Sequence, residues 1–261
     1  MIGSRLPMAR IELLQFPYST FNEKARWALD WKRIPHARTN LLPGPHRARV
    51  ARIAPASTTP VLLVDGAVVQ GSAAIVAELE RRYPEPPLYP ADPAQRERAL
   101  AIERRFDDEV GPAARQVVFR VLLDEGAYMC ALFSEGHARA KRALYRGMFP
   151  VARRLIARAY RTRDDADVAR GLATVERALD ELATQPGPSG HLVGDAFSVA
   201  DLAAASLLAP LAGPAHPDMA FPAPVPAALR AFTRRFEDHP GAKWIRETYA
   251  RHRGPAREAL R

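Results

Sequence analysis

The amino-acid sequence predicts two parts, an α/β domain followed by an all-α domain. Up to residue 82, short apolar runs alternate with segments of helical periodicity, as in a small layered domain. The next stretch, YPEPPLYPADP at residues 83–93, contains too many prolines to continue a helix. Beyond it, only helical periodicity is found. We therefore predict a first domain over residues 1–84, a linker over 85–93 and a helical domain over 94–261.

The first two elements are predicted to be a strand and a helix. Residues 11–16 form a mostly apolar run that ends before Pro17, which indicates a buried strand. The segment TFNEKARWALDW, at residues 20–31, has its apolar residues at helical spacing, so we predict a helix with one buried face. We expect Glu23 and Lys24 to lie on the opposite face, in contact with solvent.

The rest of the first domain continues the alternation. Asp65-Gly66 separates two short apolar segments and is a strong local signal for a tight β-hairpin. The Pro-, Gly- and Arg-rich piece at residues 43–57 is ambiguous, and a short irregular helix with undefined bounds is one interpretation of it. In chain order, we predict a strand at residues 37–42, this irregular piece, hairpin strands at 61–64 and 67–70, and a helix at 73–82.

The second domain is predicted to be a bundle of helices. One helix start is well marked, because Ser198-Val199-Ala200-Asp201 has the pattern of a capping box, a folding device. The predicted breaks between helices lie near Gly126, Ser134, residues 163–165, residues 185–190 and the proline-rich loop at 213–226.

The basic charge of the chain does not indicate a nucleic-acid partner. The formal net charge of +9 comes from arginines scattered along the predicted helices, as expected for solvated helix faces. No RNA-binding strand motif, zinc finger or basic zipper accompanies the charge. A basic field would still help to attract a small anion.

Cysteine use and hydropathy favour a cytoplasmic location. The single cysteine, Cys130, excludes an intramolecular disulfide, and we expect it to be a small buried residue. Residues 1–16 lack the apolar core of a secretion signal, and the apolar stretch at 199–213 is interrupted by Asp201 and Pro210. We therefore expect no secretion signal, no transmembrane helix and no membrane partner.

Four motifs then stand in a characteristic order: PYSTFNEKARWALDWKRIPH, STTPVLLVDG, VVQGSAAI and GDAFSVAD. The first resembles the strand-to-helix turn of soluble glutathione transferases, especially bacterial relatives with an omega-like or zeta-like serine-type motif. The others resemble the family's proline before the hairpin, its glutathione-recognition turn and the capping motif of its C-terminal domain. This resemblance implies a thioredoxin-like N-terminal domain that binds glutathione, a helical C-terminal domain and a homodimer.

The resemblance places Ser19 where the family has its catalytic Ser or Cys. Ser19 would then donate a hydrogen bond to the glutathione sulfur at the N-terminus of the first helix, which stabilises the thiolate. Tyr18 is the alternative, because other classes use a tyrosine for this purpose, and a simple helix-capping role for Ser19 is the third interpretation. The absence of a cysteine at this turn argues against thiol–disulfide chemistry.

The remaining glutathione contacts are also implied by the resemblance. Thr59, followed by a cis Pro60, would hold the cysteinyl part through its main chain, and Ser72 would receive the γ-glutamyl carboxylate. The position before Ser72, commonly Glu or Gln, is Gly71, with Gln70 one residue earlier, so how the γ-glutamyl ammonium is held stays open. The candidates for binding the glycyl carboxylate are His46, Arg47, Arg49 and Arg52.

These expectations lead to a glutathione S-transferase that acts on a small electrophile. Its substrate pocket is predicted between the domains, lined by the helices that hold Phe119, Tyr128, Met129 and Phe133. No metal-site or nucleotide-binding motif is present, so we expect no metal. Two alternatives stay open: a glutathione-dependent isomerase, lyase or dehalogenase, and a non-catalytic binding protein with the same fold.

Overall fold

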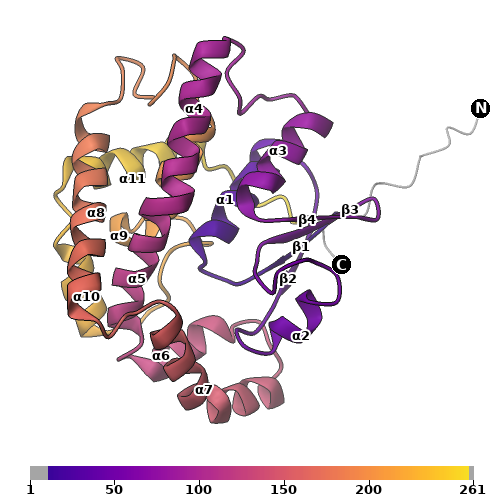
Figure 1. Ribbon diagram of the computed structural model, residues 1–261, viewed down its shortest axis with the longest axis vertical. Coiled ribbons are helices and arrows are strands. Elements are labelled where there is room, and N and C mark those ends of the chain that lie inside the picture. Colours follow the sequence, from indigo (N-terminus) through magenta and orange to yellow (C-terminus); the bar gives the residue numbers. More distant parts are fainter. Residues whose placement is uncertain (1–10, 259–261) are drawn as a thin grey trace, which may run out of the picture.

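The computed structural model describes residues 11–258, and Figure 1 shows a small sheet beside a larger group of helices. Residues 1–10 and 259–261 lie outside the described residues, and so do the parts of the predicted domains and of the expectation about a secretion signal that fall on them. The elements are β1 (Ile11–Gln15), α1 (Thr20–Trp31), β2 (Ala37–Asn40), α2 (His46–Val50), β3 (Val61–Val64), β4 (Ala67–Gln70), α3 (Ser72–Arg82), α4 (Pro93–Arg105), the π-helical turn η1 (Phe106–Val110), α5 (Gly111–Leu122), α6 (Gly126–Phe133), α7 (Arg139–Ala159), α8 (Asp165–Thr184), α9 (Val199–Ala212), α10 (Ala227–Arg234) and α11 (Pro240–His252).

The sheet has the strand order β2-β1-β3-β4. β1 pairs in parallel with β2 and antiparallel with β3, and the β3–β4 hairpin turns at Asp65-Gly66 as predicted. After α3, the described chain continues as helices. The predicted fold class, a thioredoxin-like α/β domain followed by a helical domain, is confirmed.

Alternating side chains of the strands place helices on both faces of the sheet. Leu13 of β1 belongs to the large core that includes residues of α1 and α3, whereas the next residue, Leu14, packs in a separate cluster with Val50 of α2. This alternation follows from the two-residue period of a strand. The β1–α1 turn therefore lies where the sheet meets the helical domain (Figure 1).

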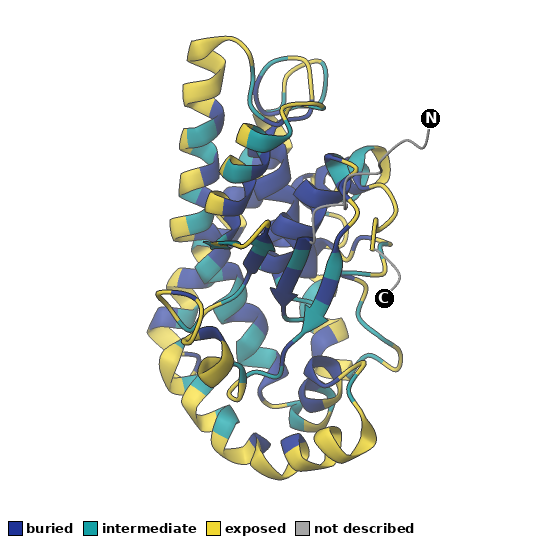
Figure 2. Ribbon diagram, turned by 90° about the vertical axis from the view of Figure 1, so that its right-hand side faces the viewer, coloured by how far each residue is buried: buried dark blue, intermediate teal, exposed yellow. Residues whose placement is uncertain are grey.

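Helix α9 is the centre of the helical domain. All of its residues are buried, and it packs against α1, α4 and α11. The predicted capping box is present at its start, where Asp201 accepts hydrogen bonds from the main-chain N–H and the hydroxyl of Ser198. Cys130 is buried, as predicted. In Figure 2, the sheet and the helices behind it are largely buried, while the lower end of the molecule, where α7 lies in Figure 1, is mostly exposed.

The prediction that Glu23 and Lys24 face solvent is wrong. Both side chains are fully buried, because α1 is covered by α3 on one side and by α5, α9 and the chain after α11 on others. Glu23 pairs with Arg253, and Lys24 pairs with Glu103 and Asp107. Periodicity identified the helix but not the number of its covered faces.

Element bounds differ from the predicted ones only at the ends. β1 ends at Gln15, β2 ends at Asn40, and α3 begins at Ser72. Within the uncertain piece at residues 43–57, the helix α2 occupies only His46–Val50. Within the described part of the chain, no helix is both long enough and apolar enough to cross a lipid bilayer.

Candidate active site

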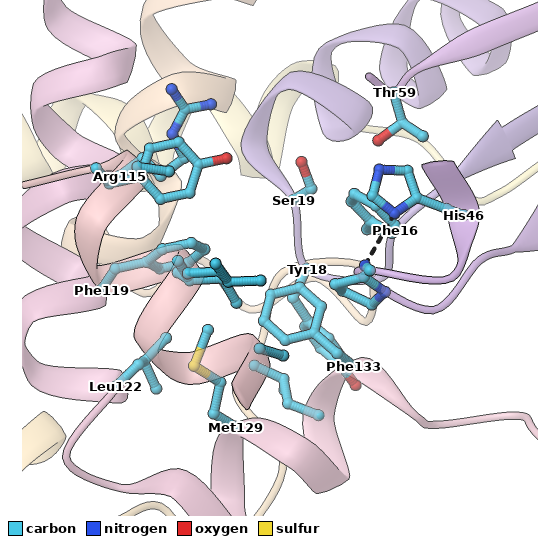
Figure 3. Close-up of a pocket in the computed structure, with 18 of the residues that line it drawn as sticks. Phe16, Tyr18, Ser19, His46, Thr59, Arg115, Phe119, Leu122, Met129 and Phe133 are labelled. Atoms are coloured by element: carbon cyan, nitrogen blue, oxygen red, sulfur yellow. Dashed lines mark hydrogen bonds between the residues drawn. The ribbon is translucent and has the colours of Figure 1, made fainter. Parts of the chain in front are cut away.

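A cavity of about 640 Å³ lies between the sheet domain and helices α5, α6 and α7. Figure 3 shows Ser19, His46 and Thr59 on one side and Arg115, Phe119 and Leu122 on the other. Most lining side chains are apolar, and aromatic rings come from both domains. The arrangement provides a large apolar space directly against the first turn of α1.

The cavity lies beside α5 and α6, the helices that hold the four residues named from the sequence. Phe119, Met129 and Phe133 line it. Tyr128 does not, and its hydroxyl instead donates a hydrogen bond of 2.9 Å to the Pro222 carbonyl. Neighbouring residues on α6 point in different directions, so Met129 faces the cavity while Tyr128 contacts the loop after α9.

Ser19 is the residue immediately before α1 and lines the cavity. Its backbone is extended, with φ −84° and ψ 127°, and its carbonyl accepts a hydrogen bond of 2.8 Å from the Glu23 N–H. Its hydroxyl makes no capping hydrogen bond, so the helix-capping role considered from the sequence finds no support. The first N–H groups of α1 and the positive end of its dipole lie at the same place.

Tyr18 has its hydroxyl committed elsewhere. Its backbone has a positive φ of 57°, and its hydroxyl donates a hydrogen bond of 2.5 Å to Oε2 of Glu135. Burial and the Glu135 carboxylate raise the pKa of the Tyr18 hydroxyl well above its usual value. This hydroxyl is a neutral donor that already has a carboxylate acceptor.

Thr59 lines the cavity, and Pro60 follows it directly before β3. The Thr59-Pro60 peptide bond is cis, as predicted. The Thr59 side chain accepts a hydrogen bond of 3.2 Å from Nδ2 of Asn22, a buried residue of α1. Thr59 is therefore tied to the same helix whose first turn carries Ser19.

Gln70, Gly71 and Ser72 form the turn from β4 into α3. The Gln70 side chain accepts a hydrogen bond of 3.0 Å from the Ala56 N–H and donates to the carbonyls of Ala56 and Thr58 at 2.6 and 2.9 Å. Gln70 thus braces the loop before Thr59. Gly71 has a φ of 95°, a conformation that favours glycine, and Ser72 is the buried first residue of α3.

The four candidate cations near α2 are in different situations. Nδ1 of His46 accepts a hydrogen bond of 3.0 Å from the Gly44 N–H (Figure 3), and its Nε2 lies 2.9 Å from the Ser57 carbonyl oxygen. Burial lowers its pKa, so His46 is a neutral structural residue. Arg49 is 3.9 Å from Glu12, and Arg52 is exposed away from the cavity lining. Arg47 is the arginine of this group that lines the cavity.

One group of possible metal ligands occurs within residues 11–258, formed by Glu23, His216 and Asp218. Both carboxylates in this group are paired with Arg253, and Asp218 also pairs with Arg38. Despite the unfavourable effect of burial, the surrounding arginines lower the pKa of Asp218 to about 2. These carboxylates belong to an ion-pair network with Arg253 and Arg38.

Both the N-terminal and the C-terminal part of the chain match known protein families. The family description "Glutathione S-transferase, N-terminal domain" matches residues 13–87, and "Glutathione S-transferase, C-terminal domain" matches residues 165–241. Together they cover more than half of the chain. The chain belongs to the glutathione S-transferase family. Membership in this family supports a glutathione-dependent activity.

Individual proteins that are similar to this chain are consistent with the family assignment. A probable maleylacetoacetate isomerase from Caenorhabditis elegans is 31% identical over 111 residues, which are 40% of this chain and 52% of that protein. The match thus spans about half the length of the relative. A solved glutathione S-transferase from Rhodospirillum rubrum has a TM-score of 0.61 at 21% identity, covering 92% of this chain and 88% of that one. Another, from Methylobacterium radiotolerans in complex with glutathione sulfonate, has a TM-score of 0.54 at 24% identity, covering 90% and 94%.

Arg115 is a site residue of this glutathione S-transferase family member that the sequence did not reveal. It lines the cavity from α5, one helical turn before Phe119. The signal was its spacing, since residues four apart on a helix share a face. Arginines scattered along the helices are expected on solvated faces, and Arg115 is an exception.

Proposed function

We propose that this protein is a glutathione S-transferase in which Ser19 activates the glutathione thiol for attack on a small electrophile. The observation that carries the proposal is the position of the Ser19 hydroxyl. It lies at the start of α1, makes no capping hydrogen bond, and borders an apolar cavity. A sulfur placed there would meet a hydroxyl donor and the positive end of a helix dipole together.

The same features explain how the thiol would be ionised. A hydrogen bond to the sulfur and the dipole of α1 both favour the charged form, which lowers the pKa of the thiol. The thiolate is the nucleophile, and Ser19 is not covalently modified. The apolar cavity beside the sulfur then holds the electrophile and excludes water.

Binding of the tripeptide is assigned to the turns around Ser19. The main chain of Thr59, before the cis Pro60, would hold the cysteinyl part, and Ser72 at the start of α3 would hold the γ-glutamyl carboxylate. Arg47 is the best-placed cation for the glycyl carboxylate, because it lines the cavity and His46 is neutral. In this proposal, Gln70 supports the Thr59 loop, and Gly71 contributes main-chain geometry only.

Tyr18 is the weaker candidate for thiol activation. Its hydroxyl already donates to Glu135, and a donor with a carboxylate acceptor would have to give up that bond before it could serve the sulfur. Ser19 has no such competing bond among its described contacts.

Two matched variants test the assignment. Ser19→Ala is expected to lower kcat for glutathione conjugation of 1-chloro-2,4-dinitrobenzene by roughly 100-fold, as for the loss of one preorganised donor. The pKa of bound glutathione, read from thiolate absorbance, should rise in parallel. Tyr18→Phe is the control and should retain kcat within about twofold. The reverse pattern would transfer the role to Tyr18.

A second candidate is a glutathione-dependent isomerase, which the similarity to the nematode protein favours. The same thiolate would add to the substrate and leave again after rearrangement. Product analysis separates the two functions, because isomerisation returns free glutathione and conjugation yields a stable thioether. A lyase or dehalogenase would likewise be recognised by its released fragment.

A non-catalytic protein with this fold would show no response to the tripeptide. Binding to the folded state alone must raise apparent stability, so millimolar glutathione should raise the Tm of an active protein. We also propose a homodimer and a cytoplasmic location, as is typical of the family. Light scattering on the purified protein tests the first, and fluorescence microscopy of a tagged chain tests the second.

A further inference from the structure

Arg115 is held in the cavity by aromatic rings instead of by acids. Its guanidinium carbon lies 4.4 Å from the centre of the Tyr160 ring and 5.4 Å from that of Phe21. These rings come from the end of α7 and from α1, so the guanidinium is fixed at a place where three elements meet. Cation–π contacts of this kind orient the group without neutralising its charge.

The guanidinium has no anionic partner within residues 11–258. Its Nε is buried without a hydrogen bond, and no ion pair or side-chain hydrogen bond of Arg115 is found in this part of the chain. The Arg115 side chain is half-buried, and a charge that has lost part of its hydration is stabilised by an anionic partner. An unpaired guanidinium at the wall of a ligand cavity therefore indicates that the missing partner belongs to the ligand.

The rest of the cavity defines the body of that ligand. Three exposed apolar side chains of α7, Met148, Val151 and Leu155, line it and are 45%, 61% and 64% exposed. A ligand that covered them would remove apolar surface from water. The Tyr145 hydroxyl, also from a residue that lines the cavity, is buried without a partner and offers a second polar contact.

We propose that the electrophile used by this protein is an aromatic or otherwise apolar molecule that carries a carboxylate, and that Arg115 binds this carboxylate. The inference rests on the proposed function and adds the substrate class. A guanidinium matches a carboxylate in geometry and can donate two parallel hydrogen bonds to it. The apolar body then lies against the α7 side chains, with its reactive carbon towards Ser19.

Arg115 is assigned to the electrophile rather than to glutathione because of its position. It projects from α5 on the wall opposite Thr59 and His46, whereas the proposed tripeptide contacts come from the sheet domain (Figure 3). Arg47 already supplies a cation on the tripeptide side. Substitution of Arg115 is therefore expected to change the KM of the electrophile and to spare that of glutathione.

The kinetic test compares 4-chloro-3-nitrobenzoate with its methyl ester, which has the same reactive ring but no charge. The ratio of kcat/KM for acid over ester should fall about 10- to 100-fold in Arg115→Gln, as for the loss of a charged hydrogen bond. Arg115→Lys should recover part of the ratio. Arg104→Gln, at an exposed position of α4, removes the same charge and should leave the ratio unchanged.

A binding test separates this proposal from the proposed function. Calorimetry with unreactive 3-nitrobenzoate and its neutral analogue 3-nitrobenzamide requires neither glutathione nor turnover. Wild type should bind the acid more tightly, and Arg115→Gln should bind both equally, with circular dichroism showing that it is folded. Equal affinities in wild type, or an unchanged preference in Arg115→Gln, would overturn the assignment. If binding behaves as expected but neither ring is conjugated, the transferase proposal fails while the carboxylate site stands.

Discussion

Arg253 and Glu23 stand 230 positions apart in the sequence and form a fully buried ion pair, with Nε of Arg253 2.8 Å from Oε1 of Glu23. The same guanidinium contacts Asp30 at 2.8 Å and Asp218 at 2.7 Å. The end of α11 is thereby joined to the helix that carries the candidate active site. This network connects the C-terminal segment to α1.

Arg253→Met is expected to lower the free energy of unfolding by about 3–5 kcal/mol, because it leaves buried carboxylates without their counter-charge. Urea denaturation followed by circular dichroism measures the change. Arg251→Met is the matched control, since Arg251 is exposed and its one ion pair within residues 11–258 is with Glu247 on the same helix. It should alter stability by no more than about 0.5 kcal/mol. Equal effects would show that the buried network contributes little.

The ion pairs of Lys24 predict how the effect of a Lys24→Met substitution on stability changes with pH. Burial raises the pKa values of Glu103 and Asp107, and Lys24, at 2.8 and 2.5 Å, opposes that rise. In Lys24→Met these pKa values rise further. A raised pKa in the folded state gives stability that is present below the unfolded value and lost as pH increases.

The loss of stability in Lys24→Met relative to wild type should therefore be smaller near pH 5 than near pH 8, because the raised pKa values of Glu103 and Asp107 favour their neutral forms at the lower pH. Thermal unfolding of both proteins across this range measures it. Lys243→Met, at an exposed position 3.9 Å from Glu247, is the control and should show no such trend. If the loss of stability in Lys24→Met instead became larger as the pH was lowered, the ion-pair explanation would be contradicted.

Substitution by alanine should have opposite effects on stability at Gly71 and at Gly147. Neither has a neighbouring atom within 4 Å of an added Cβ, but Gly71 has a φ of 95° whereas Gly147 lies within α7. Gly71→Ala should destabilise the protein by about 1–3 kcal/mol because of backbone strain. Gly147→Ala should stabilise it by about 0.5–1 kcal/mol. Differential scanning calorimetry gives both values, and similar shifts for the two variants would exclude strain as the cause.

At the start of α9, substitution of Asp201 should destabilise the protein more than substitution of Ser198. Ser198→Ala removes a cap and should cost about 1 kcal/mol. Asp201 is fully buried and accepts from the Leu192 N–H as well as from Ser198, so Asp201→Ala leaves several donors unsatisfied. A larger loss of stability in Asp201→Ala than in Ser198→Ala, measured by chemical denaturation, is the expected result. The opposite order would show that the link to Leu192 is unimportant.

Local signals account for what the sequence determined. The hairpin at Asp65-Gly66, the start of α1 after Ser19 and the capping box at Ser198 each depend on a few adjacent residues. The cis bond before Pro60 was expected from the resemblance to the family instead, because a local Thr-Pro sequence permits a cis bond without requiring it. The fold class followed from the order of these local elements, and the resemblance to the family from their spacing.

Only the tertiary structure decided which side chains meet. Glu23 and Lys24 were expected in solvent and are buried, because α1 is covered by elements from distant parts of the chain. Arg115 had the same appearance in the sequence as its solvated neighbours, and only its contacts with Phe21 and Tyr160 distinguish it. Periodicity determines one buried face of a helix, whereas burial of a charge depends on what packs against the other faces. The turn proposed to activate the thiol could therefore be located from a contiguous motif that resembles the family, whereas the surroundings of the proposed substrate required the fold.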